Sequence, residues 1–314
     1  MKTMRLGRSE LECSRLGFGC WRLVDRQSPE QAGPAVQERA RAAVLAAYEA
    51  GYTLFDHADI YGDGEPERVF GQVLRQVPGM RERVVIVTKC GIRRAGDPGP
   101  EAPYRYDFSA EHIIRSCEGS LRRLGIEMID VLLLHRPDYL MDPAEVAAAF
   151  DHLKRTGKVR HFGVSNFRPS QLTALQRACS MPLIVHQVEI SLANLTCLED
   201  GTLDQCLEQQ ITPMAWSPLA GGLLGQGAHR LLPAQQSYRV ESVLSVLDQL
   251  AAAHQTSRAV IALAWLLRHP AGIQPLVGST QPARIAEAAR AAEIQLSREE
   301  WYRLLEAARG QRLP

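Results

Sequence analysis

The sequence predicts a closed barrel of eight parallel β-strands, each followed by an α-helix, which is the (β/α)8 or TIM-barrel fold, with a short β-hairpin before it. Two observations support this fold. Apolar strand-like segments alternate with helix-like segments from residue 16 almost to the end, with no linker between them. Polar side chains also gather where several of these strands end. Parallel strands joined by helices close into barrels whose active sites lie at the carboxyl ends of the strands.

The elements are expected in the following order. Residues 4–16 alternate and turn at Gly7, as a hairpin does. Helical spacing and end signals, such as Gly51 after the first helix and Ser109 as an N-cap, define the helices. The expected strands are 16–21, 53–55, 84–89, 128–135, 161–165, 183–190, 212–216 and 273–278. The expected helices are 37–49, 66–75, 110–124, 143–156, 169–179, 240–253, 257–268, 281–292 and 297–308.

An open, doubly wound sheet is the alternative architecture. That fold binds a dinucleotide at a GxGxxG turn after its first strand, and the chain offers only Gly17-Phe18-Gly19 and Gly62-Asp63-Gly64. The closed barrel is therefore preferred. Two long connections, 91–109 and 218–238, interrupt the alternation. Long loops of this kind are usually functional, so both are expected to border the site.

Composition excludes several classes of protein. The 314 residues are 46% hydrophobic, enough for a single barrel domain over 1–314. Net charge is +1 without runs of like charge, so a nucleic-acid partner is not expected. No apolar stretch has the length of a membrane span or a signal peptide, and the seven cysteines show no CxxC motif. The sequence thus predicts a cytoplasmic protein with reduced thiols, and a monomer is favoured.

Side chains that handle protons stand at or just past the ends of three successive strands. Asp56 and Tyr61 follow the second expected strand, and Lys89 ends the third. His135 ends the fourth. Only four of the 36 Lys and Arg residues are lysines, so Lys89 is not routine surface charge. A Tyr with a pKa of about 10 becomes a usable acid–base group when a Lys held by an Asp favours its phenolate.

With these residues in place, the chain resembles the aldo-keto reductases, and most of all the bacterial YdhF-type oxidoreductases. The matching stretches are 16–21, 55–62, 86–89, 129–135, 157–167, 187–189, 216–219 and 275–287. The resemblance implies NADPH-dependent reduction of small-molecule aldehydes or ketones. In that reaction Tyr61 is the proton donor, tuned by Lys89 and Asp56, and His135 positions the carbonyl.

The resemblance also implies where the cofactor binds. Ser165, Asn166 and Gln187 would hold the nicotinamide carboxamide, whose edges need donors and acceptors. Trp216 offers a face for the nicotinamide ring, and the backbone of 217–222 suits a pyrophosphate. Arg284, in a helix that begins near Pro282, would bind a ribose 2′-phosphate and so select NADP. The full expected set is Gly19, Trp21, Asp56, Ser165, Asn166, Gln187, Trp216, Ser217, Leu219, Gly222, Gly278, Ser279, Thr280, Arg284 and Glu287.

The chain departs from the commoner family pattern at two positions. Gly278 stands where many members carry Lys, and Ala288 where many carry Asn, so one phosphate contact and one adenine contact are missing. NAD(H) therefore stays the alternative cofactor. The substrate pocket is expected between Trp21, Tyr61, the loop at 104–106 and the stretch 219–224. These apolar walls predict hydrophobic aldehydes or ketones.

Two other functions compete with this interpretation. A metal-dependent hydrolase could use side chains near strand ends, namely His57, Asp59, His135, His161 and His186. The sequence has no HxH pair, and neighbours such as Asp56 and His57 point to opposite faces of a strand, so no metal is predicted. A redox-sensing subunit that binds cofactor with little turnover is the second alternative. The presence of all four proton-handling residues favours an enzyme.

Overall fold

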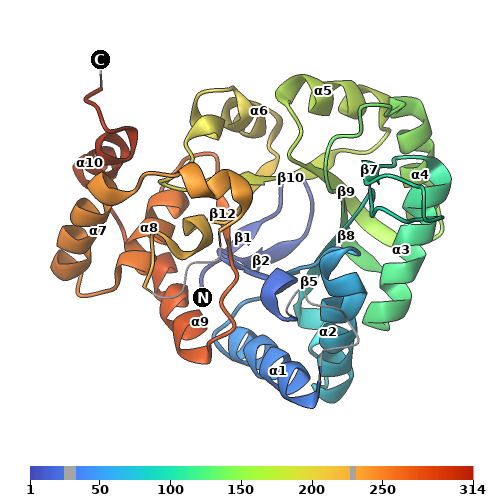
Figure 1. Cartoon of the computed structure of the whole chain (residues 1–314), viewed down its shortest axis with the longest axis horizontal. Coiled ribbons are helices and arrows are strands. Elements are labelled where there is room, and N and C mark those ends of the chain that lie inside the picture. Colours follow the sequence, from blue (N-terminus) through green and yellow to red (C-terminus); the bar gives the residue numbers. More distant parts are fainter. Residues whose placement is uncertain (25–32, 227–230, 314) are drawn as a thin grey trace.

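The computed structural model describes residues 1–24, 33–226 and 231–313. It confirms the predicted barrel, in which eight parallel strands close in the order β10-β11-β12-β3-β4-β5-β8-β9 (Figure 1). The ring closes between the last strand and the first, where Leu276 lies opposite Gly17. The strands are β3 (Gly17–Gly19), β4 (Leu54–Asp56), β5 (Val85–Cys90), β8 (Ile129–Leu134), β9 (Val159–Ser165), β10 (Leu183–Glu189), β11 (Thr212–Trp216) and β12 (Gln274–Val277).

Helices surround the barrel, and α10 packs against α7 at the outer edge (Figure 1). They are α1 (Pro34–Glu49), α2 (Glu65–Gln76), α3 (Ala110–Leu124), α4 (Pro143–Arg155), α5 (Pro169–Ala178), α6 (Thr202–Gln209), α7 (Glu241–Ala253), α8 (Arg258–Leu267), α9 (Pro282–Ala289) and α10 (Arg298–Arg309). Helix α6 is absent from the helices predicted from the sequence. This short helix follows Gly201 and has no side-chain cap, so it lacks the usual start signal.

The predicted N-terminal hairpin is present and closes one end of the barrel. It consists of β1 (Thr3–Arg5) and β2 (Glu12–Ser14). Leu6 and Leu11, in its turn, belong to a buried cluster with the side chains that fill the barrel interior. The Gly7 N–H also donates to Thr212 Oγ1, at the start of β11, at a distance of 2.8 Å. The hairpin therefore covers the amino ends of the strands and leaves the carboxyl ends for the site.

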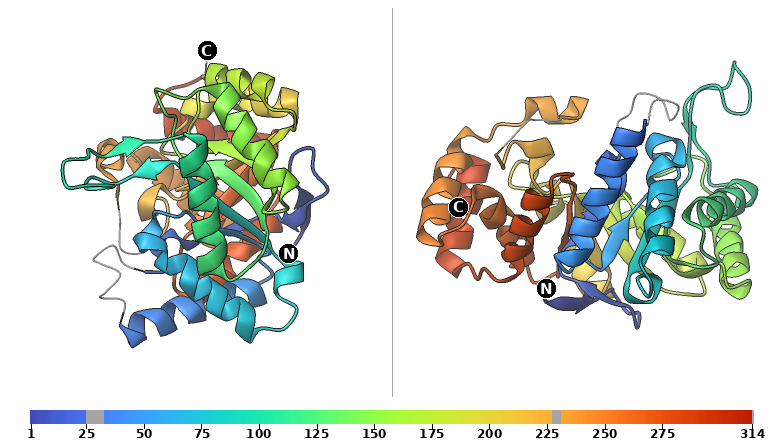
Figure 2. Two further views of the ribbon diagram at one scale, coloured as in Figure 1. Left: turned by 90° about the vertical axis from the view of Figure 1, so that its right-hand side faces the viewer. Right: turned by 90° about the horizontal axis from the view of Figure 1, so that it is seen from below.

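The long connection at 91–109 forms a second hairpin, which projects from the opposite end of the barrel (Figure 2). Its strands are β6 (Ile92–Arg93) and β7 (Arg105–Tyr106). Arg93 bridges Asp97 at 2.8 Å and Asp107 at 2.9 Å, which orders the loop. Within the ranges described above, no helix is long and apolar enough to cross a membrane. All seven cysteines are free thiols.

Candidate active site

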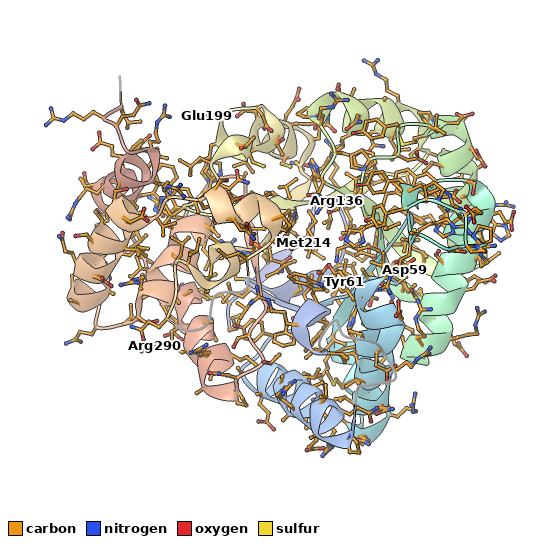
Figure 3. All side chains as sticks on the ribbon, viewed as in Figure 1. Asp59, Tyr61, Arg136, Glu199, Met214 and Arg290 are labelled. Carbon is orange, nitrogen blue, oxygen red and sulfur yellow. The ribbon has the colours of Figure 1, made fainter. Side chains whose placement is uncertain are left out.

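A buried chain of polar groups lies at the carboxyl ends of β4 and β5. The Lys89 ammonium donates to Asp56 Oδ2 at 2.8 Å, to the His57 carbonyl at 2.7 Å and to Tyr61 Oη at 3.2 Å. Lys89 is 0% exposed and Asp56 is 3% exposed. The three side chains that the sequence predicted to act together are therefore in direct contact. Tyr61 lies toward the middle of the molecule, whereas Glu199 and Arg290 lie nearer its outer edge (Figure 3).

Backbone pairing after β4 explains how Tyr61 reaches Lys89. The chain continues along β5 beyond the strand end, because the Asp59 N–H donates to the Lys89 carbonyl at 3.0 Å. The Tyr61 N–H then donates to the Ala58 carbonyl at 3.1 Å, which turns the chain back. Gly62 follows with a φ of +46°, a left-handed conformation that glycine adopts readily. This turn holds the phenol over the buried ammonium.

Burial and neighbouring charges act in opposite directions on the pKa of Lys89 and on the pKa of Tyr61. Burial acts to lower the pKa of Lys89, but Asp56 and Tyr61 outweigh it and raise this pKa above its ordinary value. Burial raises the pKa of Tyr61, and the Lys89 charge offsets only part of that rise. The influence of Lys89 agrees with the prediction from the sequence, whereas the larger effect of burial was not predicted. At neutral pH the lysine is therefore charged and the tyrosine holds its proton.

His135 lies beside Tyr61, with ring centroids 5.7 Å apart and an interplanar angle of 77°. Burial, with the charges of Lys89 and Arg136 adding to it, lowers the pKa of His135 well below its ordinary value, so the imidazole is neutral. Nδ1 is enclosed and has no hydrogen-bond partner among the described residues. Nε2 is therefore the nitrogen that faces the cavity.

Strands β9, β10 and β11 contribute a connected set of polar groups beside the buried chain. Asn166 donates to Ser165 Oγ at 2.8 Å and accepts from the Trp216 indole N–H at 2.9 Å. Gln187 donates from Nε2 to Asp56 Oδ1 at 2.8 Å, which links this set to Lys89. Nothing among the described residues donates to Gln187 Oε1. Because Gln187 borders the cavity, that oxygen is an available acceptor.

One cavity of about 770 Å³ joins these groups. All the predicted cofactor residues line it except Thr280, and three of the four predicted catalytic residues do. The fourth, Lys89, lies beneath the wall with no exposed surface. The lining residues from the predicted set are Gly19, Trp21, Asp56, Tyr61, His135, Ser165, Asn166, Gln187, Trp216, Ser217, Leu219, Gly222, Gly278, Ser279, Arg284 and Glu287.

The cavity extends to the N-terminus of α9. Arg284 lies in the first turn of this helix and is exposed. Gly278 precedes the helix, and a Cβ added there would meet no atom within 4 Å. Ser257 and Ala259, at the start of α8, also line the cavity and were not predicted. No motif marks these two residues, because only the packing of α8 against α9 brings them there.

Three arginines that were not predicted also lie in the cavity wall, namely Arg22, Arg94 and Arg136. The expectation of apolar walls is therefore only partly right. Tyr104 from the projecting hairpin lines the cavity as expected, whereas Tyr106 does not. The one available signal was the position of Arg136, directly after His135 at a strand end. The other arginines carry no motif of their own.

Two of the histidines considered as metal ligands, His57 and His161, lie in separate surroundings. His57 packs against Phe70, with ring centroids 4.8 Å apart. His161 contacts Glu10 at 3.1 Å near the opposite end of the barrel. No group of three or more potential metal ligands occurs within residues 1–24, 33–226 and 231–313. The geometry gives the hydrolase alternative no support.

The fold and this site define an oxidoreductase barrel, and comparison with known proteins identifies its family. The model of the aldo/keto reductase family matches residues 15–309, so the chain belongs to that family of oxidoreductases. A 6-dehydroglucose reductase of Novosphingobium aromaticivorans is 41% identical over 317 residues, covering 99% of this chain and 96% of that protein. Oxidoreductase YdhF of Escherichia coli is 40% identical over 304 residues, covering 96% of each chain.

A solved structure shows the same architecture. The crystal structure of the thermostable aldo-keto reductase Tm1743, in complex with the inhibitor epalrestat, superimposes with a TM-score of 0.82 at 26% identity. The match covers 98% of this chain and 100% of that one. Both the predicted fold and the predicted resemblance are confirmed.

Proposed function

We propose that the protein reduces aldehydes or ketones to alcohols with NADPH, using Tyr61 as the general acid. The observation that carries this proposal is the buried chain from Asp56 through Lys89 to Tyr61, with contacts of 2.8 Å and 3.2 Å. A charged ammonium beside a protonated phenol is suited to releasing and recovering one proton. The position of this chain at the wall of a large cavity gives a small substrate access to Tyr61.

Each of the four residues has a separate role in the proposed reaction. The neutral His135 donates from Nε2 to the substrate carbonyl oxygen and orients it. Tyr61 gives its proton to that oxygen as negative charge develops there. The Lys89 ammonium stabilises the phenolate that remains, and Asp56 holds Lys89 in place. A bound nicotinamide cofactor supplies the hydride for the carbonyl carbon.

The polar groups at β9 to β11 fit such a cofactor. The unpartnered Oε1 of Gln187 can accept from a carboxamide N–H, and Ser165 and Asn166 provide further polar atoms beside it. These acceptors and donors are already fixed by hydrogen bonds to neighbouring strands, so binding requires little ordering. Ser217 and the backbone near Gly222 border the same cavity between this end and α9.

Arg284 supports NADP rather than NAD. The described residues show no ion pair or hydrogen bond for its guanidinium, and it lies at the N-terminus of α9 beside the cavity. A guanidinium can pair with a 2′-phosphate through two parallel hydrogen bonds. The small-molecule substrate is a carbonyl compound, in keeping with the reductases to which the chain is similar.

Tyr61→Phe tests the proposal directly. Loss of the hydroxyl removes the proton donor, so turnover should fall at least about a hundredfold, the scale of general-acid catalysis. The dissociation constant for NADPH, measured by tryptophan fluorescence, should barely change. Tyr139→Phe is the matched control, because Tyr139 is 87% exposed. If Tyr61→Phe turns over at the parent rate with saturating substrate, Tyr61 is not the acid.

A further inference from the structure

Arg136 has a position that the proposed reaction does not explain. It directly follows His135 at the end of β8 and lines the cavity beside Tyr61, His135 and Trp216. Its guanidinium carbon lies 5.5 Å from the centroid of the Trp216 ring. Figure 3 labels Arg136, like Tyr61, in the central part of the molecule. The side chain thus brings a permanent positive charge to the part of the cavity where the carbonyl would react.

The other arginines of this region contrast with Arg136. Arg93 is held by Asp97 and Asp107. Arg94 pairs with Asp63 and donates to the Ile60 carbonyl at 2.7 Å. Within the described part of the chain, Arg136 forms neither an ion pair nor a hydrogen bond. Its guanidinium contacts the indole ring of Trp216.

The contact with the face of Trp216 positions the guanidinium without using its N–H groups. Guanidinium has five donors that lie in its plane, and contact with an aromatic face leaves all of them free. Trp216 is itself fixed by its bond to Asn166, at 2.9 Å. The donors of Arg136 are therefore held ready in the cavity, at little entropic cost to a ligand.

The balance of charge around Tyr61 is positive because of Arg136. The Lys89 charge is offset by Asp56, and the Arg94 charge by Asp63. Arg136 has no such counter-charge. Its field reaches the reacting groups. It adds to the effect of burial in lowering the pKa of His135, and it acts against burial, which raises the pKa of Tyr61. A cation without a counter-charge beside the reacting groups attracts anionic ligands to this end of the cavity.

We propose that Arg136 determines specificity by binding an anionic substituent, a carboxylate or a phosphate, on the carbonyl substrate. Arg binds both groups through two parallel hydrogen bonds. This inference rests on the proposed reduction, because it assigns the substrate class to the same cavity. It replaces the hydrophobic substrates expected from the sequence with acidic aldehydes and ketones.

The test compares each acid with its neutral ester in the parent and in Arg136→Gln. Suitable pairs are 4-carboxybenzaldehyde with its methyl ester and succinic semialdehyde with its methyl ester, which place the acid at two distances from the carbonyl. The parent should have a lower KM for the acid of at least one pair. Arg136→Gln should raise that KM by about tenfold to a hundredfold, the worth of hydrogen bonds between charged groups. The KM of the ester and both kcat values should change little.

Phosphate is tested by competition. Phenyl phosphate and benzoate should inhibit reduction of the neutral ester competitively in the parent, and Arg136→Gln should weaken whichever of them binds at Arg136. Arg94→Gln is the matched variant, because it removes an equal charge that Asp63 already offsets. The ratio of the KM for the acid to the KM for the ester should stay much closer to the parent value in Arg94→Gln than in Arg136→Gln.

Several outcomes would overturn the inference. Equal KM values for acid and ester in the parent would show that the cavity does not select charge. Equal losses on acid and ester in Arg136→Gln, with a shifted pH profile for both, would show that Arg136 acts through Tyr61 instead. An equal effect of Arg94→Gln would assign the selectivity to the general field. None of these results affects the proposed function, which stands on the turnover of the neutral esters and its loss in Tyr61→Phe.

Discussion

At the scale of single residues, the main feature is a lysine with no contact with solvent. Lys89 keeps its charge because Asp56 lies 2.8 Å away and the His57 carbonyl 2.7 Å away. Burying a charge without such partners would cost several kcal/mol, on the order of 3–5 kcal/mol for a broken pair. Partners and burial together make Lys89 a fixed electrostatic neighbour of Tyr61 rather than a mobile surface group.

Lys89→Met should therefore change the pH dependence of the reaction as well as its rate. The Lys89 charge lowers the pKa of Tyr61 against the larger effect of burial, so its removal raises that pKa further. The proposed reduction needs the protonated phenol, so we expect activity to be lost as pH rises through the Tyr61 pKa. In the variant this loss should move to higher pH, while the rate at neutral pH falls about a hundredfold or more because the acid is weaker. Rates measured from pH 6 to 11 test both effects.

Two controls separate this effect from misfolding. Lys154→Met changes an exposed lysine in α4 and should leave the pH profile as it is. Asp56→Asn combined with Lys89→Met removes both charges, so it avoids leaving a lone buried carboxylate. Circular dichroism establishes whether each variant is folded. A folded Lys89→Met enzyme with the parent profile would show that Lys89 does not tune Tyr61.

Residues at strand ends could be predicted from the sequence, but contacts across the barrel could not. Asp56, Lys89 and His135 each follow an apolar strand, and parallel strands bring their carboxyl ends together. The contact of Arg136 with Trp216 joins β8 to β11, which do not pair with each other in the barrel. Nothing in the spacing of these two residues indicates that one faces the other. Nor does the sequence indicate that burial has a larger effect than Lys89 on the pKa of Tyr61.

At the scale of elements, α9 is the helix that we propose distinguishes the two cofactors. Arg284→Ala should weaken NADPH binding by about 1.5–3 kcal/mol, the worth of hydrogen bonds to a charged group. NADH lacks the 2′-phosphate, so its affinity should change little. Both dissociation constants can be measured by quenching of tryptophan fluorescence, since Trp21 and Trp216 line the cavity.

Gly278→Lys provides the complementary variant. A side chain at this position meets no atom within 4 Å from its Cβ, so the lysine can be accommodated. It should tighten NADPH binding, because it adds a cation at the same end of the cavity. Equal losses for the two cofactors in Arg284→Ala, or tighter binding of NADH by the parent, would contradict a phosphate site at α9.

Local signals explain which elements the sequence predicted well. The helix α3 has the predicted bounds, because the Ser109 side chain accepts from the His112 N–H and Gly125 ends the helix in a left-handed conformation. The helix α9 is shorter than predicted, since a 3-10 turn at Arg290–Ala292 follows it. The missed α6 has only 8 residues and is followed by Gln210 in a left-handed conformation, which is not a typical helix terminator. Clear capping residues therefore made the bounds of α3 predictable, and their absence explains why α6 was not predicted.

At the scale of the whole molecule, the closed barrel depends on close contacts between strands. Gly163 in β9 illustrates this, because a Cβ there would lie 2.4 Å from the Val185 carbonyl oxygen of β10 and 2.8 Å from a Leu133 methyl group of β8. Backbone atoms on a neighbouring strand cannot move aside without disturbing the barrel. The smallest possible side chain should therefore strain three strands at once.

Gly163→Ala should destabilise the fold by about 1–3 kcal/mol, the usual cost of overpacking. Thermal or urea unfolding followed by circular dichroism measures the difference. Gly99→Ala is the control, because a Cβ at Gly99 meets no atom within 4 Å and should cost little. Equal stability of Gly163→Ala and the parent would mean that the strands can separate locally.

The uneven distribution of lysines has a practical consequence. Lys89 is enclosed, and the other lysines are Lys2 beside β1, Lys154 near the end of α4 and Lys158 just before β9. All three lie toward the amino ends of the strands, on the side away from the cavity. Amine-reactive reagents should therefore attach the protein to a solid support with the mouth of the cavity facing outward. Because most basic residues are arginines, the few accessible lysines would orient the immobilised protein, and the buried Lys89 amine would not react.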